Sequence, residues 1–336
     1  MVPPRAAQKT LQKVHEGGLL DGRRKVVSRK DFVEIPVHKS ICETPINGLS
    51  FHNIVHQERP EFYDRTPGLV DVLGDNITAE HRSLLPRGWY LLGKVIVVKI
   101  DPRLEGLKED IGQALLSIYP RCRCVLRDRG IDGQFRVPQR EVIAGNGTET
   151  VHRENGVIFK LDAMRVMFSQ GNLKERMRMG SLGKNEIVVD MFAGIGYFSL
   201  PMAVHSRPLK IHSIELNPTA YRYLVENVRL NYVENIVEPM FGDCFLKAPE
   251  NVAHRVIMGY VGNTNRYLSA GIRALRRGGV LHYHQTVPEW LYPHALENEV
   301  RNAAFLENRG VQVLRCARVK KYSPGMLHAV LDVKIE

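Results

Sequence analysis

The 336-residue sequence predicts an α/β protein whose last section is a doubly wound sheet ending in an antiparallel hairpin. Two observations predict this architecture. From about residue 156, short apolar runs alternate with helix-like runs, which is typical of a parallel sheet with helices on both faces. The last two apolar runs, 311–320 and 328–335, flank a turn at Ser323-Pro324-Gly325, so we expect them to be antiparallel neighbours.

Two smaller α+β domains are expected before this section, at residues 1–66 and 67–155, leaving 156–336 for the sheet. The first domain opens with a helix-like stretch at 7–16. In the second, an apolar run at 90–100 predicts a strand and residues 107–119 predict a helix. The basic residues that follow occupy alternate positions of a strand and could present one face to phosphate: Arg121, Arg123, Arg127 and Arg129. A solvated strand face fits the same pattern.

The elements of the last section follow in order along the chain. Strands are expected at 186–191, 210–215, 236–241, 255–261 and 280–286. Helices are expected at 197–204, 218–230 and 264–277. The third helix is expected to close at Gly278-Gly279, with Arg276 and Arg277 near its negative end.

Charge predicts an anionic partner. The chain holds 47 Lys+Arg against 36 Asp+Glu, a net charge of +11. The surplus is spread as +3 over residues 1–66, +5 over 67–185 and +3 over 186–336. This distribution fits a large polyanion such as a nucleic acid lying across several domains. The sequence has no apolar run long enough for a membrane span and no signal-peptide core, so we expect a soluble, cytoplasmic protein.

The cysteines predict neither disulfides nor a metal site. They stand at positions 42, 122, 124, 244 and 316, without a second pair at zinc-ligand spacing. His282 and His284 share one face of an expected strand but have no third ligand at a recognisable spacing. We therefore expect reduced, structural cysteines and no bound metal.

The strongest local signal is a glycine-rich turn between a strand and a helix. The strand ends at Asp190, and Gly194 and Gly196 allow backbone N–H groups to approach a ligand closely. Glu215 closes the next strand, where an acid can bind ribose hydroxyls. Ser199 occupies the place of the third glycine of a dinucleotide site, and an acid before the glycines would repel a pyrophosphate. These two features disfavour a nicotinamide-dependent oxidoreductase.

The run D-M-F-A-G-I-G at 190–196 resembles the first motif of class I S-adenosylmethionine-dependent transferases, which have a Rossmann-like sheet. The resemblance implies that Asp190, Gly194 and Gly196 flank the methionine part of S-adenosyl-L-methionine. It implies that Glu215 binds the ribose. It places the adenine at Asp243 and Cys244, which follow the third strand.

Longer stretches narrow the resemblance. Over about residues 70–336 the chain is similar to the wybutosine-synthesising tRNA aminocarboxypropyltransferases, relatives of the archaeal and eukaryotic tRNA guanine-N1 methyltransferases. The stretches that carry the likeness are 167–176, 190–196, 258–261, 282–289 and 321–325. The resemblance implies that Ser169 and Arg176 contact the cofactor, and a guanidinium can hold a carboxylate with two hydrogen bonds. As substrate-binding residues we expect Tyr260, Asn263, Arg121 and Arg123.

Three features distinguish the two branches. Residues 1–66 resemble the small N-terminal domain of the methyltransferases. Gly171 stands where the methyltransferases carry an arginine, and the tract 262–265 lacks the proline of their Asn-x-Pro motif. The last two features favour the aminocarboxypropyl branch. A tRNA guanine-N1 methyltransferase is the alternative, and a tRNA-binding protein with a vestigial cofactor site is a further one.

The implied reaction moves the 3-amino-3-carboxypropyl group of S-adenosylmethionine to 4-demethylwyosine, next to the anticodon of tRNA(Phe). The leaving group is 5′-methylthioadenosine, and the cofactor supplies the electrophile. Glu175 is the candidate general base by resemblance to the methyltransferases, although an arginine partner is an equal interpretation of this residue. We expect a monomer.

Overall fold

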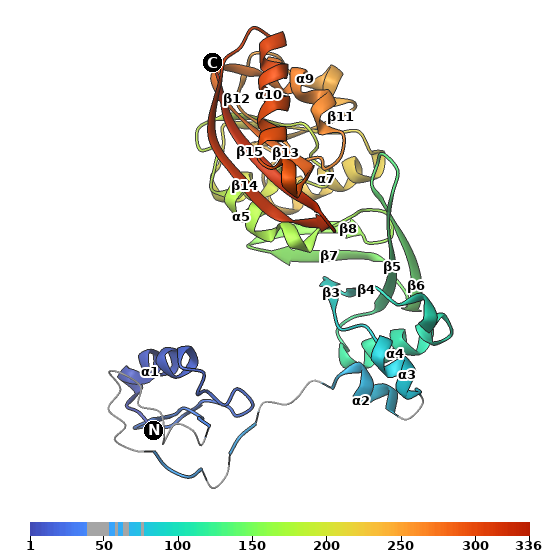
Figure 1. Ribbon diagram of the computed structural model, residues 1–336, viewed down its shortest axis with the longest axis vertical. Helices are drawn as coiled ribbons and strands as arrows, with labels where there is room; N and C mark the ends of the chain where they lie inside the picture. The colour runs from blue at the N-terminus through green and yellow to red at the C-terminus, as the bar shows by residue number, and fades with distance from the viewer. Residues whose placement is uncertain (39–53, 58–59, 63–66, 75–76) are drawn as a thin grey trace. The chain divides into compact units, whose positions relative to one another are not determined.

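The computed structural model describes residues 1–38, 54–57, 60–62, 67–74 and 77–336, and the chain forms two compact units, Met1–Pro67 and Gly68–Glu336 (Figure 1). The first unit contains helix α1 (Pro4–Glu16) and a short antiparallel pair, β1 (Val27–Ser28) and β2 (Val33–Glu34). The expected helix is confirmed and begins one turn earlier, at a proline, which is tolerated in a first turn.

The second unit begins with a four-stranded sheet in the order β3-β4-β5-β6. Its strands are β3 (Trp89–Leu92), β4 (Val95–Val98), β5 (Cys124–Asp132) and β6 (Val137–Gly145). Its helical segments are α2 (Leu69–Leu73), α3 (Ala79–Leu84), η3 (Pro102–Leu107) and α4 (Lys108–Ile118). The prediction of one strand at 90–100 is wrong, because the chain turns back at Gly93 (φ 53°), where a Cβ atom would lie 2.2 Å from the carbonyl oxygen of Val151.

A hairpin joins this part to the large sheet. It consists of β7 (Glu149–Glu154) and β8 (Val157–Asp162), so the domain boundary expected at 155 falls in its turn. The side-chain amides of Asn227 and Asn231 bond the backbone of β8: their Oδ1 atoms accept from Lys160 N (2.7 Å) and Ile158 N (2.9 Å). These bonds pair the free edge of β8 with the helix that carries Asn227 and ends just before Asn231.

The large sheet has seven strands in the order β11-β10-β9-β12-β13-β15-β14. Its strands are β9 (Ile187–Asp190), β10 (Lys210–Glu215), β11 (Val237–Phe241), β12 (Ala253–Met258), β13 (Leu275–Pro288), β14 (Val311–Ser323) and β15 (Met326–Ile335). The first five strands are parallel to one another, β15 runs antiparallel to β13, and β14 pairs antiparallel with β15 to complete the hairpin, which confirms the expected doubly wound sheet. The strand order reverses between β9 and β12, so a crevice is expected at their carboxyl ends.

Helices cover both faces of this sheet (Figure 1). One face packs on α5 (Leu173–Gly180), α6 (Ser199–His205) and α7 (Pro218–Leu230), and the other on α8 (Cys244–Lys247), α9 (Leu268–Ala274) and α10 (His294–Leu306). Val188 belongs to the first core and Val189 to the second, as the alternation of side chains along a strand requires. Short 3₁₀ turns complete the set: η4 (Gln170–Asn172), η5 (Thr264–Tyr267) and η6 (Glu289–Leu291).

The helix expected at 264–277 is shorter than predicted. It ends at Ala274, and Arg276 and Arg277 begin the long strand β13. The glycine pair builds a bulge in this strand, since the pairing with β12 shifts between Ala253 and Arg255 and Gly278 has φ 77°. Glycine is favoured both at the end of a helix and in a β-bulge, so the Gly278-Gly279 pair alone could not distinguish the two structures.

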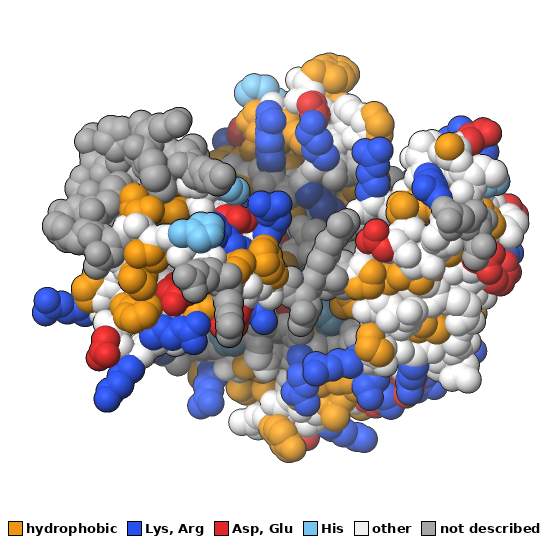
Figure 2. Space-filling view, turned by 90° about the horizontal axis from the view of Figure 1, so that it is seen from below, with side chains coloured by type: hydrophobic (Ala, Val, Ile, Leu, Met, Phe, Trp, Pro, Cys, Tyr) orange, Lys and Arg blue, Asp and Glu red, His pale blue; other side chains and the backbone are white. Residues whose placement is uncertain are grey.

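Basic side chains are spread over the described part of the surface drawn in Figure 2. In Figure 2 the Lys and Arg side chains are dispersed over the face in view, with acidic and apolar side chains between them. Cys122, Cys124, Cys244 and Cys316 are free thiols, and Cys42 lies outside the described residues. Within the described ranges, none of the helices has the length and apolar composition needed to cross a bilayer, and no three His, Cys, Asp or Glu side chains converge as metal ligands.

Candidate functional site

The glycine turn after β9 forms the centre of the candidate site. Gly194 has φ 59° and Gly196 has φ 101°, a backbone region that L side chains rarely adopt. A Cβ atom at Gly194 would lie 2.4 Å from the Tyr197 ring, and one at Gly196 would lie 2.5 Å from Leu200. The turn therefore needs glycine at both positions, and it lies at the carboxyl edge where the strand order reverses.

Asp190 is fully buried beneath this turn and has no cationic partner in the described part of the chain. Its Oδ2 accepts a hydrogen bond from Ser199 Oγ (2.7 Å), and Ser199 in turn accepts one from Ser213 Oγ (2.8 Å). Burial, with a smaller contribution from the nearby Glu215 carboxylate, raises the pKa of Asp190 to about 6. A positively charged ligand at this edge would lower the cost of ionising Asp190.

Glu215 ends the neighbouring strand and is oriented by the same turn. Its Oε2 accepts from Gly194 N (2.7 Å) and its Oε1 accepts from Asn217 N (2.6 Å). Burial raises the pKa of this carboxyl group. A carboxylate offers about four lone-pair positions, so two backbone bonds leave room for ligand hydroxyl groups.

Asp243 and Cys244 follow β11 along the same edge. The Asp243 carboxylate caps α8 by accepting from Phe245 N at 2.9 Å. Cys244 is buried, and burial raises the pKa of its thiol to about 12, so the thiol is not a nucleophile at neutral pH. Together with Asp190 and Glu215, these residues form one row at the ends of successive strands.

Ser169 lies just before α5, and Arg176 lies within this helix. The Arg176 guanidinium donates from Nε and Nη2 to the Glu154 carboxylate (2.6 and 2.7 Å) and from Nη1 to the Ser169 carbonyl (2.8 Å). Only 2% of Arg176 is exposed. The two-bond grip expected on a cofactor carboxylate is thus made on Glu154, and direct contact of Arg176 with the cofactor stays a prediction.

Glu175 is buried in the first turn of α5 and has an arginine partner. Arg178 donates to both of its oxygens and also to Asp332, with Nη1 to Oδ2 at 2.9 Å. His284 Nε2 lies 3.6 Å from Glu175 Oε1. The arginine-partner interpretation of Glu175 is therefore confirmed, and its role as a base stays a prediction.

Aromatic side chains gather at the carboxyl end of β12. The Tyr260 and Phe192 rings are stacked with centroids 5.3 Å apart, and Tyr267 meets Phe192 edge-on. The turn between β5 and β6 reaches this point, where Gln134 accepts from the Tyr260 hydroxyl (3.3 Å) and Arg136 Nη1 donates to the Val261 carbonyl (2.7 Å). Asn263 is exposed just beyond. Sequence reasoning missed Tyr267 and Arg136, which belong to no recognisable motif.

The four arginines around β5 do not form a free basic stripe. Arg127 is buried and pairs with Glu105, and Arg129 pairs with Glu141 (2.5 Å). Arg123 is exposed but donates to the Gly147 carbonyl (3.2 Å). Arg121 is exposed and forms no ion pair with the described residues. The prediction of one shared phosphate-facing stripe is wrong for Arg127 and Arg129, because acids from other elements neutralise them.

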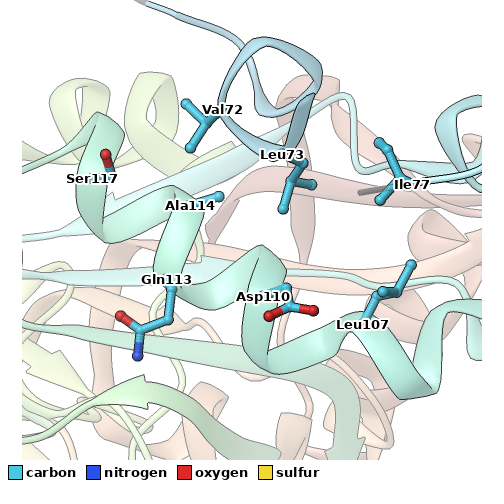
Figure 3. Close-up of a pocket in the computed structure, with 8 residues that line it drawn as sticks. All are labelled: Val72, Leu73, Ile77, Leu107, Asp110, Gln113, Ala114 and Ser117. Atoms are coloured by element: carbon cyan, nitrogen blue, oxygen red, sulfur yellow. The ribbon is translucent and has the colours of Figure 1, made fainter. Parts of the chain in front are cut away.

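A groove of about 440 Å³ lies elsewhere, between α2 and α4 (Figure 3). It is lined by Val72, Leu73, Ile77, Leu107, Asp110, Gln113, Ala114 and Ser117. Leu73 points from α2 toward α4, and among the described lining residues only Asp110 is ionisable. The groove lacks the convergent polar groups found at the glycine turn, so it does not compete as the catalytic site.

Three family models match the chain in succession. The tRNA methyltransferase 5 N-terminal domain matches residues 1–44, the TYW2 N-terminal domain residues 69–148, and the TRM5/TYW2 methyltransferase domain residues 150–314. The boundary between the second and third models falls immediately before β7, a few residues before the boundary expected at 155.

Three similar proteins align with this chain over nearly the whole of their own lengths. The tRNA(Phe) (4-demethylwyosine(37)-C(7)) aminocarboxypropyltransferases of Methanocaldococcus jannaschii and Pyrococcus horikoshii are 41% and 37% identical over 73% and 80% of this chain, and 96% of each relative is matched. The tRNA (guanine(37)-N(1))-methyltransferase Trm5b of Pyrococcus abyssi is 31% identical over 99% of this chain and 98% of its own length.

Solved structures agree with these sequence relatives. The crystal structure of P. horikoshii TYW2 in complex with MeSAdo has a TM-score of 0.73 at 35% identity, covering 80% of this chain and 98% of that one. M. jannaschii TYW2 in complex with AdoMet has a TM-score of 0.61 at 35% identity, covering 74% and 99%. The chain therefore belongs to the TRM5/TYW2 family of tRNA-modifying enzymes, alongside the tRNA(Phe) 4-demethylwyosine aminocarboxypropyltransferases.

Proposed function

We propose that this protein transfers the 3-amino-3-carboxypropyl group of S-adenosylmethionine to 4-demethylwyosine in tRNA(Phe) and releases 5′-methylthioadenosine. The observation that carries the proposal is its 41% and 37% identity to two named aminocarboxypropyltransferases over 96% of their lengths. We further propose that the protein acts as a soluble cytoplasmic monomer.

The residues of the sheet edge fit the cofactor. The Asp190 carboxylate, buried without a cation, suits the positively charged methionine end, and the glycine turn allows the ligand to approach the backbone. Glu215 keeps lone pairs for the two ribose hydroxyls. Asp243 and Cys244 border the position of the adenine. Bound there, S-adenosylmethionine supplies the activated carbon, and the protein's part is to orient it.

The RNA base is proposed to enter beside the aromatic pair Tyr260 and Phe192. Bases of single-stranded loops are commonly bound by stacking on aromatic rings, and this pair lies at the reversal point of the strand order. Asn263 is exposed at the same edge for a hydrogen bond to the base, and Arg121 and Arg123 are proposed to contact phosphates.

The second candidate function is methyl transfer to guanine N1 at the same nucleotide. The match of residues 1–44 to the N-terminal domain of tRNA methyltransferase 5 favours it, as does a guanine-N1 methyltransferase relative that aligns over 99% of this chain. The lower identity of that relative, 31%, places this function second.

The small product separates the two functions. The full-length protein is incubated with S-adenosylmethionine and either tRNA(Phe) carrying 4-demethylwyosine or the same tRNA with unmodified guanosine. We expect 5′-methylthioadenosine with the modified tRNA and no turnover with the unmodified one. S-adenosylhomocysteine, formed with the unmodified tRNA, would establish the methyltransferase instead. Turnover with neither tRNA, despite binding, would overturn both.

A further inference from the structure

Lys320 on β14 is a partly buried cation that meets no carboxylate in the described part of the chain. Its Nζ donates to Ser169 Oγ at 2.7 Å, the one hydrogen bond that its side chain makes to these residues. Burial lowers the pKa of Lys320, and the positive charges of Arg136 and Arg176 lower it further. A desolvated ammonium group in a positive field lacks the anion that normally balances such a charge.

The two neighbouring cations differ from each other in this respect. Arg176 is neutralised by Glu154, at 2.6 and 2.7 Å. Arg136 donates to the neutral carbonyl of Val261 and forms no ion pair with the described residues. Two positive charges, those of Lys320 and Arg136, are therefore left without a protein anion beside Ser169. This excess charge calls for an anionic ligand.

Gly171 makes room for Lys320. A Cβ atom at residue 171 would lie 3.2 Å from Cδ and 3.6 Å from Nζ of the lysine, so the lysine stem occupies the space that a side chain would take. Gly171 itself has no positive φ, so a larger residue can be accommodated by the backbone there. The position of the ammonium group thus depends on the absence of a side chain two residues after Ser169.

We propose that Lys320, supported by the charge of Arg136, binds the carboxylate of the aminocarboxypropyl group of S-adenosylmethionine. The inference rests on the proposed function for the identity of the ligand. The alternative cation, Arg176, already has its guanidinium edge on Glu154, whereas Lys320 reaches the same serine with its charge unbalanced. A carboxylate held by a charged donor at this point would fix the direction of the arm that is transferred.

The test compares three ligands by calorimetry without tRNA: S-adenosylmethionine, its decarboxylated analogue and 5′-methylthioadenosine. In Lys320→Met, we expect the affinity for S-adenosylmethionine to fall about 10-fold, the size of one charge-assisted hydrogen bond. Affinities for the two ligands without the carboxylate should stay unchanged, which also shows that the variant is folded. Lys321→Met is the matched control, since this exposed neighbour on β14 should change none of the three.

Gly171→Val provides a second variant that keeps the lysine. Gly171→Val should weaken the binding of S-adenosylmethionine and leave the binding of the other two ligands unchanged. The double variant should lose no more affinity for S-adenosylmethionine than Lys320→Met loses. An equal loss of affinity for all three ligands would overturn the proposal. A loss of tRNA affinity alone would also overturn it, and would assign the charge of Lys320 to an RNA phosphate. Because these are binding measurements, they stand apart from the product assay: S-adenosylhomocysteine there would leave the Lys320 result valid.

Discussion

Asp190 and Asp332 are both buried in the same seven-stranded sheet, yet their surroundings are opposite. Asp332, on β15, accepts from His282 Nδ1 (2.6 Å) and from Arg178 Nη1 (2.9 Å). Burial opposes its ionisation, but the hydrogen bond from His282 and the charge of Arg178 bring the pKa of Asp332 to about 2. Asp190 has no such partner, and burial raises its pKa to about 6. An acid that serves the fold is neutralised by the protein, and the acid at the ligand edge is left to be neutralised from outside.

His282, on β13, belongs to the same kind of site as Asp332. His282 donates from Nδ1 to Asp332 and accepts at Nε2 from Arg255 (2.6 Å), and burial lowers its pKa, so it is a neutral link in a chain of ion pairs. Arg255 continues the chain to Glu186 with a bond of 2.7 Å. This network ties β12, β13 and β15 together and, through Arg178, links them to α5.

The largest effect is expected where the network is broken. Asp332→Ala leaves His282 buried without its acid and leaves Arg178 with Glu175 as its remaining partner, so the free energy of unfolding should fall by about 3 kcal/mol at pH 7. Denaturant unfolding measures it. Since the pKa of Asp332 is lowered, its stabilisation is present above the unfolded value of 3.8 and is lost as the pH falls toward 2. A loss below about 1 kcal/mol would show that solvent already screens the pair.

Substitution of Asp190, at the proposed cofactor edge, is expected to change the stability in the opposite direction. Asp190→Asn removes a buried charge, so at pH 7 the variant should be more stable by up to about 3 kcal/mol. The pKa of Asp190 is raised to about 6, so the wild type is fully stabilised below 3.8 and loses stability as the pH rises through 6. The difference between variant and wild type should therefore grow from pH 4 to pH 7 in unfolding experiments.

The same variant should weaken S-adenosylmethionine binding by about 10–100-fold, the value of an interaction with a charged group. Ser199→Ala is the matched control, because it removes the hydrogen bond to Asp190 but keeps the charge, and it should have a smaller effect on affinity. An Asp190→Asn protein that is destabilised and binds normally would reverse the comparison between the two acids.

The sheet edge that we propose binds the cofactor can be predicted from the sequence because its constraints are local. The turn at Gly194 and Gly196 needs positive φ within a few residues of Asp190, and this leaves a recognisable pattern. Glu215 and Asp243 follow strands whose apolar runs are equally visible. The parallel sheet and its two helical layers follow from the same alternation of strands and helices.

The rest of the site depends on contacts between distant segments, which leave no pattern. Lys320 lies 151 positions after Ser169, and Arg136 reaches Val261 from the other sheet. The expected stripe on β5 failed for the same reason: Glu105 and Glu141, which neutralise Arg127 and Arg129, come from elements outside the strand. Alternation shows which residues share a face, and it says nothing of what that face meets.

The smallest expected effect concerns two surface arginines, one unpaired within the described ranges and one paired with an acid. Arg121 is exposed without an ion pair among the described residues, and Arg129 is paired with Glu141 at 2.5 Å. If free cations are the ones that contact tRNA phosphates, Arg121→Ala should reduce the salt dependence of tRNA affinity by roughly 0.7–0.9 log units per log unit of salt. Arg129→Ala should reduce it by less, since part of its charge is spent on the glutamate. Affinities measured between low and moderate salt give both slopes. Equal slopes would mean that the exposed ion pair with Glu141 is too weak to keep Arg129 from contacting the RNA, since such pairs contribute little energy. The distinction between free and neutralised charges would then apply only to buried groups.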